Sequence, residues 1–243
     1  FRKTTLKNGL RIITAPQKNT ETVTVLILVS TGSKYETKEI SGISHFLEHL
    51  FFKGTEKRSS AKIIAETLDK VGGIYNAFTS TECTGFFAKV EASHSELALD
   101  WVSDIFLNST LPAKEIEKEK GVIIEEINMY YDHPMSYVQT LWPKLLYGDQ
   151  PAGRDVAGTK ETVSKIKRQN LIDYVKNHYT ASNVVVCIAG KIDGSEGLAK
   201  AEKYFSKMNT GQAINNLEVV EQQDQPQCLL HHRKTDQTHF CLG

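Results

Sequence analysis

Three features are absent or scarce in this chain: a surplus of charge of one sign, a long hydrophobic run and a dense set of cysteines. Lysine plus arginine number 29 and aspartate plus glutamate also number 29 in 243 residues, so the formal net charge is zero. Nucleic-acid backbones select basic proteins, so we expect no nucleic-acid partner. The longest apolar runs, at 23–29 and 184–189, are far shorter than the roughly 20 residues of a membrane span. We therefore expect no membrane partner.

The cysteines are few and widely spaced, without a CxxC or CxxH pattern: Cys83, Cys187, Cys228 and Cys241. This spacing does not suit a disulfide scaffold and indicates reduced thiols. The N-terminal residues enter strand-like sequence without the apolar core of a signal peptide. The sequence therefore predicts a cytoplasmic protein of bacterial type, with the mature form of an organellar matrix protein as the alternative.

The composition is that of a globular protein, with 40% hydrophobic and 24% charged residues. Hydrophobic periodicity predicts strands at 4–6, 10–14, 23–29, 74–80, 84–90 and 183–189. It predicts helices at 42–52, 60–71, 93–108, 113–131, 136–147, 160–178 and 195–208. Strands and helices are partly segregated, which favours an α+β fold with a mixed, largely antiparallel sheet packed against helices.

Three segments follow from the change in composition along the chain. Residues 1–208 form one predicted domain, and the polar, Asn- and Gln-rich stretch 209–227 is a predicted linker. Strand-like sequence at 228–233 and 238–242 predicts that 228–243 is the truncated start of a second domain.

The run His45-Phe46-Leu47-Glu48-His49 is the most informative motif. On a helix, His45 and His49 lie one turn apart on one face and can bind one metal ion. Glu48 is rotated slightly from them, close enough to accept a proton from a water on that metal. This inverted H-x-x-E-H order is a signature of zinc proteases. The alternative is a helix whose histidines are merely packed and hydrogen-bonded.

A third ligand is expected in the acidic segment 113–131. Glu119 and Glu126 are seven residues apart, hence two turns apart on one helix face. Val122 and Ile123 share that side, which suggests that it packs inward. The alternative is a solvated acidic stripe paired with neighbouring lysines, Lys114, Lys118 and Lys120.

The motif and the residues after it, 45–55, resemble the signature of the pitrilysin/insulinase family of inverzincin metallopeptidases. The resemblance is strongest to the branch that contains mitochondrial processing peptidase and its bacterial relatives, and it covers nearly the whole chain. Residues 72–80 resemble the edge strand of that family, and 151–154 with 158–159 resemble its downstream loop.

The resemblance implies a role for each matching residue. Zinc ligands are His45, His49 and Glu126; catalytic groups are Glu48 as general base and Glu119 as a supporting acid. Glu125 is a neighbour that an error of one residue would promote, but on a helix it points about 100° away from Glu126. Mn²⁺ is the alternative metal, since such a site accepts several ions.

A peptide substrate is expected along the resembling strand, at Asn76, Ala77, Phe78 and Thr79. An edge strand pairs with an extended peptide through main-chain hydrogen bonds. The alternative is an ordinary interior strand. In the family, a second homologous half closes the substrate chamber, so the expected partner is such a half or a partner subunit, or a second copy in a homo-oligomer.

These observations predict a zinc-dependent endopeptidase that hydrolyses extended peptides or unfolded proteins. One alternative is a non-catalytic structural or substrate-binding subunit, or half of such a peptidase, because an isolated half could bind zinc and cleave nothing. A small-molecule metal lyase is less favoured, because the lyase that shares this motif uses a cysteine as third ligand, and no cysteine lies in 113–131.

Overall fold

The computed structural model describes residues 1–212 and 214–243. Its strands are β1 (Arg2–Thr5), β2 (Arg11–Pro16), β3 (Thr22–Val29), β4 (Ile74–Thr79), β5 (Thr84–Glu91) and β6 (Val184–Gly190). Its helices are α1 (Ile43–Leu50), α2 (Ala61–Asp69), α3 (Ser95–Leu107), α4 (Ala113–Asp132), α5 (Pro134–Tyr147), α6 (Lys160–Lys165), α7 (Arg168–His178) and α8 (Gly194–Phe205).

The strands form one mixed sheet in the order β1-β2-β6-β3-β5-β4. Only the pairing of β2 with β6 is parallel, and the other four are antiparallel. This arrangement confirms the expected α+β class. β4 lies at one edge of the sheet and is not an interior strand, the alternative that its sequence had left open.

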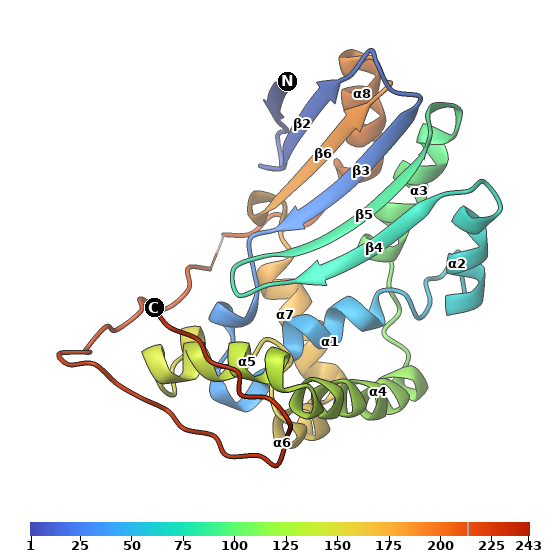
Figure 1. Cartoon of the computed structure of the whole chain (residues 1–243). Helices are drawn as coiled ribbons and strands as arrows, with labels where there is room; N and C mark the ends of the chain where they lie inside the picture. The colour runs from blue at the N-terminus through green and yellow to red at the C-terminus, as the bar shows by residue number, and fades with distance from the viewer. Residues whose placement is uncertain (213) are drawn as a thin grey trace.

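One face of the sheet carries the hydrophobic core. Along β3 the side chains alternate, with Val23, Val25 and Ile27 fully buried and the residues between them half-buried. Helices α3 and α8 pack on the sheet, while α1 and α4–α7 gather beyond one end of the strands (Figure 1). The group of helices α1 and α4–α7 therefore lies next to the sheet at β4, where α1 contacts that strand.

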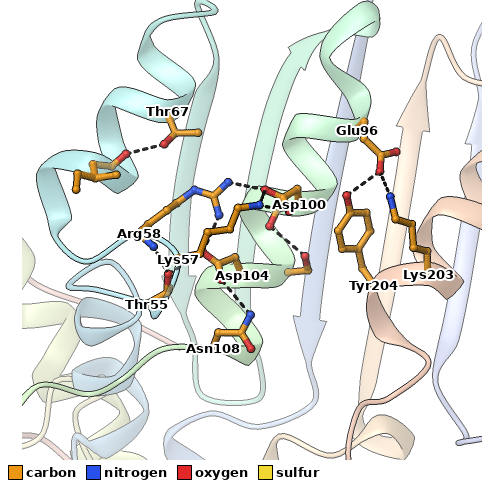
Figure 2. A network of polar contacts seen from close by, with 12 residues as sticks. Thr55, Lys57, Arg58, Thr67, Glu96, Asp100, Asp104, Asn108, Lys203 and Tyr204 are labelled. Atoms are coloured by element: carbon orange, nitrogen blue, oxygen red, sulfur yellow. Dashed lines mark hydrogen bonds and ion pairs between the residues drawn. The ribbon is translucent and has the colours of Figure 1, made fainter.

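The chain after α1 is attached to α3 by a buried polar network (Figure 2). Arg58 donates to Asp104 and to Asp100 at 2.6 Å each, and Thr55 donates to the same oxygen of Asp104 at 2.7 Å. The Arg58 side chain is only 5% exposed. The turn that follows α1 is thereby fixed against the core.

The helical signal over 160–178 divides into two helices, because Ile166 and Lys167 between them have extended backbones. One prediction of local structure is wrong. The segments 228–233 and 238–242 contain no strand. A strand needs a neighbouring strand and an apolar surface to cover it, whereas Leu230 and Leu242 are 90% and 91% exposed. The division at 208, the linker and the second domain stay predictions.

Among the residues that the structure describes, no helix has the length and apolar character needed to cross a membrane.

Candidate metal centre

Helix α1 presents His45 and His49 on one face, as the spacing predicts. Their Nε2 atoms lie 3.3 Å apart. The helix starts after Gly42, whose φ of +96° favours glycine and whose Cα faces Gly158 so closely that a Cβ would lie 2.5 Å from the carbonyl oxygen of Ala157. This close approach sets where the helix begins.

Helix α4 packs beside α1 and brings Glu126 to the two histidines (Figure 1). Glu126 Oε2 lies 3.6 Å from Nε2 of His45 and 3.4 Å from Nε2 of His49. Glu125 lies on the exposed side of α4, where it accepts a hydrogen bond from Asn128. The structure thus brings Glu126 to the histidines and leaves its neighbour outside.

The spacing of these three side chains fits a zinc ion. Zinc takes imidazole nitrogen and carboxylate oxygen at about 2.0–2.2 Å in a tetrahedral arrangement, which places ligand atoms about 3.3–3.5 Å apart. The observed separations of 3.3 and 3.4 Å match that edge length, and the third, 3.6 Å, exceeds it by about 0.1 Å. Within the described part of the chain, this is the group of histidine, cysteine and acidic residues close enough to hold a metal, and it contains no cysteine.

Burial and neighbouring charges shift the pKa values of the two histidines in opposite directions. Burial, together with the charge of His49, lowers the pKa of His45 to about 4, so its imidazole is neutral near pH 7, the form that binds metal. Burial also acts to lower the pKa of His49, but hydrogen bonds to Glu126 and Glu119 outweigh it and raise that pKa. The two carboxylates thus favour a positive charge at this position, which is the environment that a metal cation would meet.

Glu119 lies behind His49. Its Oε2 is 3.2 Å from Nδ1 of His49, and its side chain is only 4% exposed. The same face of α4 buries Ile123, as expected, but Val122 is 47% exposed and lies outside it. The acidic stripe exists as well, on the outer side, where Glu117 pairs with Lys120 at 2.8 Å.

Glu48 points from α1 toward the edge strand. Its Oε2 accepts a hydrogen bond from Thr79 Oγ1 at 2.6 Å. Burial raises the pKa of Glu48, while the hydrogen bond from Thr79 and the charge of His49 act to lower it. A carboxyl with a raised pKa is a stronger base, which suits a proton acceptor.

The predicted peptide-binding residues lie along the exposed edge. Asn76 and Phe78 are exposed, whereas Ala77 and Thr79 are half-buried. The Phe78 ring packs where a side chain of Gly85 on β5 would stand. The Asn76 side chain accepts from the backbone N–H of Ala77 at 2.9 Å. Strand β4 therefore joins a free sheet edge to the Glu48 carboxylate through Thr79.

Two contacts of the site were missed by sequence reasoning. Lys53 Nζ lies 2.7 Å from Glu119 Oε1, and Glu36 accepts hydrogen bonds from the first backbone N–H groups around α1. Lys53 belongs to the run that carries the resemblance, but no spacing rule connects it to Glu119, which is distant in sequence. Glu36 precedes the helix in a polar connection and carried no signal.

A cavity of about 1090 Å³ lies between α4, α5 and residues 148–162. Ile127 and Tyr130 line it from α4, just beyond Glu126, but none of the three candidate ligands does. The metal centre is thus a separate site on the neighbouring surface.

Comparison with known proteins shows the family to which this chain is similar. Residues 11–160 match the insulinase family, peptidase family M16, and residues 165–243 match the family described as the peptidase M16 inactive domain. All the residues of the candidate metal centre fall within the first match.

Similar sequences include the uncharacterized zinc protease YmxG of Bacillus subtilis, 40% identical over 100% of this chain and 58% of the relative. The probable mitochondrial-processing peptidase subunit beta of Arabidopsis thaliana is 36% identical over 86% of this chain and 39% of the relative. The chain spans about half the length of the bacterial relatives it matches.

Similar folds include a protease from Helicobacter pylori, with a TM-score of 0.83 and 23% identity over 90% of this chain and 53% of that one. The periplasmic protease PqqL from Escherichia coli has a TM-score of 0.80 and 25% identity over 92% of this chain and 25% of its own.

Proposed function

Because the chain belongs to the insulinase family of peptidases, family M16, we propose that it is the metal-binding half of a zinc-dependent endopeptidase that cleaves extended peptides or unfolded proteins. The observation that carries the proposal is the cluster of His45, His49 and Glu126, contributed by two helices distant in sequence. It lies within reach of a carboxylate base and beside a free sheet edge.

In this proposal His45, His49 and Glu126 hold zinc. When bound, the ion supplies a Lewis acid that polarises the scissile carbonyl and makes water a better nucleophile near pH 7. Two neutral imidazoles and one carboxylate would supply three protein ligands, the number that catalytic zinc sites use. Mn²⁺ is the alternative metal.

Glu48 accepts the proton of the attacking water. The hydrogen bond from Thr79 engages Oε2 of Glu48, so Oε1 is the oxygen available for that proton. Its raised pKa allows Glu48 to keep the proton and then deliver it to the leaving amine. Glu119 orients His49 from behind.

The peptide binds as an additional strand along β4. Since β4 ends the sheet, its outer N–H and C=O groups face no other strand among the described residues. The Thr79 hydroxyl bonds to Glu48, so a peptide paired with residues Asn76–Thr79 would pass the base at one end of the strand.

The relatives suggest a second half. Because the chain spans about half of their length, we propose that a homologous half or partner subunit completes the substrate chamber, with a homo-oligomer as the alternative. The four cysteines are free, in keeping with a reducing compartment, and we propose the cytoplasm, with an organellar matrix as the alternative.

Metal content and turnover test the function together. We expect about one zinc per chain in the wild type, loss of that zinc in Glu126→Gln, and unchanged zinc in the matched control Glu125→Gln. Glu48→Gln should keep its zinc but lose peptide hydrolysis in the form that contains the second half, because Glu48 is not a ligand.

Three outcomes would contradict parts of this proposal. If the wild-type chain binds no zinc after the metal is added back, the assignment of the metal centre is wrong. If Glu48→Gln hydrolyses peptides as fast as the wild type, Glu48 is not the general base. Zinc without hydrolysis, with the second half present, favours a non-catalytic substrate-binding subunit.

A further inference from the structure

The ion pair between Lys53 and Glu119 extends the metal centre by one more residue. Lys53 Nζ lies 2.7 Å from Oε1 of Glu119, while Oε2 of the same carboxylate lies 3.2 Å from Nδ1 of His49. The side chains of Lys53 and Glu119 are 22% and 4% exposed. One oxygen is held by the ammonium and the other faces the imidazole, so the plane of the carboxylate is fixed.

The orientation of His49 depends on this carboxylate. A neutral imidazole has one N–H, and when Nδ1 donates to Glu119 the lone pair lies on Nε2, which faces Glu126 and His45. His45 has no such support, because its Nδ1 is buried without a hydrogen-bond partner among the described residues. Of the two histidines, His49 is thus the one whose Nδ1 is held by another side chain, that of Glu119.

Lys53 is held in place by its backbone rather than by its side chain. Its backbone N–H donates to Leu50 at 3.0 Å, and the carbonyl oxygen of Gly54 accepts from the backbone N–H and the hydroxyl of Thr110 at 3.0 and 3.1 Å. Gly54 has a φ of +152°, which favours glycine. Thr55 and Arg58 then attach the same segment to α3 (Figure 2). Replacing the Lys53 side chain leaves these contacts intact.

We propose that Lys53 is a positioning residue: by holding the Glu119 carboxylate, it orients His49 and tightens zinc binding. This inference rests on the proposed function, because it concerns zinc at the same site. A positive charge near a cation site by itself weakens cation binding. Removal of Lys53 should therefore tighten zinc binding if only its charge matters, and weaken binding if it positions Glu119.

The test measures the zinc dissociation constant by competition with a chromophoric chelator, at fixed pH and salt. Groups that support metal ligands from behind typically contribute about 10–100-fold in metal affinity. We expect Lys53→Met to weaken zinc binding about tenfold and Lys53→Arg, which keeps the charge and the donor, to restore most of it. Lys57→Met is the matched control, since Lys57 lies in the same turn, is 58% exposed and pairs with Asp100.

A double-mutant cycle shows whether Lys53 acts through Glu119. In the Glu119→Gln background, Lys53→Met should change the zinc affinity by less than about twofold, because the partner it holds is already altered. A purely structural loss would weaken binding equally in both backgrounds. Thermal unfolding of the zinc-free proteins checks that each variant is folded; Lys53→Gln replaces Lys53→Met if the methionine variant is not.

The outcomes separate this inference from the proposed function. Zinc binding by the wild type with equal or tighter binding by Lys53→Met overturns the role of Lys53 alone. Equal losses in the wild-type and Glu119→Gln backgrounds overturn the action through Glu119. No zinc in the wild type overturns both the role of Lys53 and the metal centre.

Discussion

Glu36 is a carboxylate buried at the start of the helix that carries both histidines. It accepts hydrogen bonds from the backbone N–H groups of Gly42 and Ser44 at 2.7 and 2.9 Å, and it is 2% exposed. Burial raises its pKa to about 7, although those two hydrogen bonds and the nearby Arg154 act to lower it. The start of α1 therefore depends on a group that titrates close to neutral pH.

Glu36→Gln should change how stability depends on pH. Between the ordinary pKa of 4.5 and about 7, the folded protein keeps a proton on Glu36 that the unfolded chain has lost. The Glu36 contribution to the free energy of unfolding is thus complete below pH 4.5 and falls as pH rises, by roughly 3 kcal/mol up to pH 7.

Urea unfolding of both proteins from pH 5 to pH 8 measures this contribution. The wild type should lose stability relative to Glu36→Gln as the pH rises, because the variant has no proton to lose and the charge of Arg154 is common to both. If the difference in the free energy of unfolding between the two proteins stays constant over this range, Glu36 does not titrate there.

Thr79 links the sheet edge to the base and gives a second prediction at this scale. Thr79→Val keeps the shape but removes the hydroxyl that donates to Glu48. This hydrogen bond, of a kind that contributes about 1.5–3 kcal/mol, orients the Glu48 carboxylate. Its loss would raise the pKa of Glu48 further but leave the carboxylate unoriented, so kcat/KM should fall about tenfold or more while zinc content stays unchanged.

Peptide turnover by the form with the second half provides the measurement for Thr79. Thr79→Ser retains the donor and should recover most of the activity. Equal activity in Thr79→Val and the wild type would show that Glu48 needs no such partner.

At the scale of elements, α1, the turn after it and α4 form one unit around the metal centre. The turn is attached to α3 through Arg58, whose guanidinium bridges Asp100 and Asp104 (Figure 2). Asp104 is 4% exposed and has no access to bulk water as a substitute partner. The position of Lys53 thus depends on a buried ion pair outside the site.

Arg58→Met should destabilise the fold. Removing one partner of a buried pair leaves an uncompensated charge and costs about 3–5 kcal/mol. Lys57→Met breaks a pair whose lysine is 58% exposed and should cost less than about 1 kcal/mol. Urea unfolding of the two variants gives the comparison; similar losses in both would contradict the burial argument.

For the whole molecule, the core and the metal centre lie within residues 1–208. The buried hydrophobic cluster runs from Leu10 to Met208, and the described residues of 209–243 add none to it. The described residues of that segment contact the rest through polar and aromatic side chains at the surface, as in the contacts of Val220 with Gln150 and of Arg233 with Tyr131.

Removal of residues 213–243 should leave folding and metal binding unchanged. Hydrophobic burial is the main stabilising contribution, and this deletion removes none from the core. The thermal midpoint should shift by less than about 4 °C, the shift that about 1 kcal/mol produces in a domain of this size. Calorimetry and zinc content check this, and a large drop would contradict the predicted boundary at 208.

The sequence by itself determined what depends on local periodicity. One helical turn separates His45 from His49, and two turns separate Glu119 from Glu126, so backbone geometry alone placed each pair on one face of its helix. Helix geometry also excluded that Glu125 and Glu126 both serve as ligands, since neighbouring residues on a helix point in different directions, and the resemblance to the family selected Glu126. The strand and helix types followed in the same way, apart from the break at Ile166.

Only the tertiary structure decided which of these faces meet and what surrounds them. The hydrogen bond from Thr79 to Glu48 and the ion pair of Lys53 with Glu119 join residues 31 or more positions apart in the chain. The edge position of β4 depends on the order of all the strands in the sheet. Likewise, residues 228–233 have strand-like composition but no strand beside them. Periodicity encodes the face that a residue occupies within its own element. The partner of that face depends on how the elements pack, which no local spacing contains.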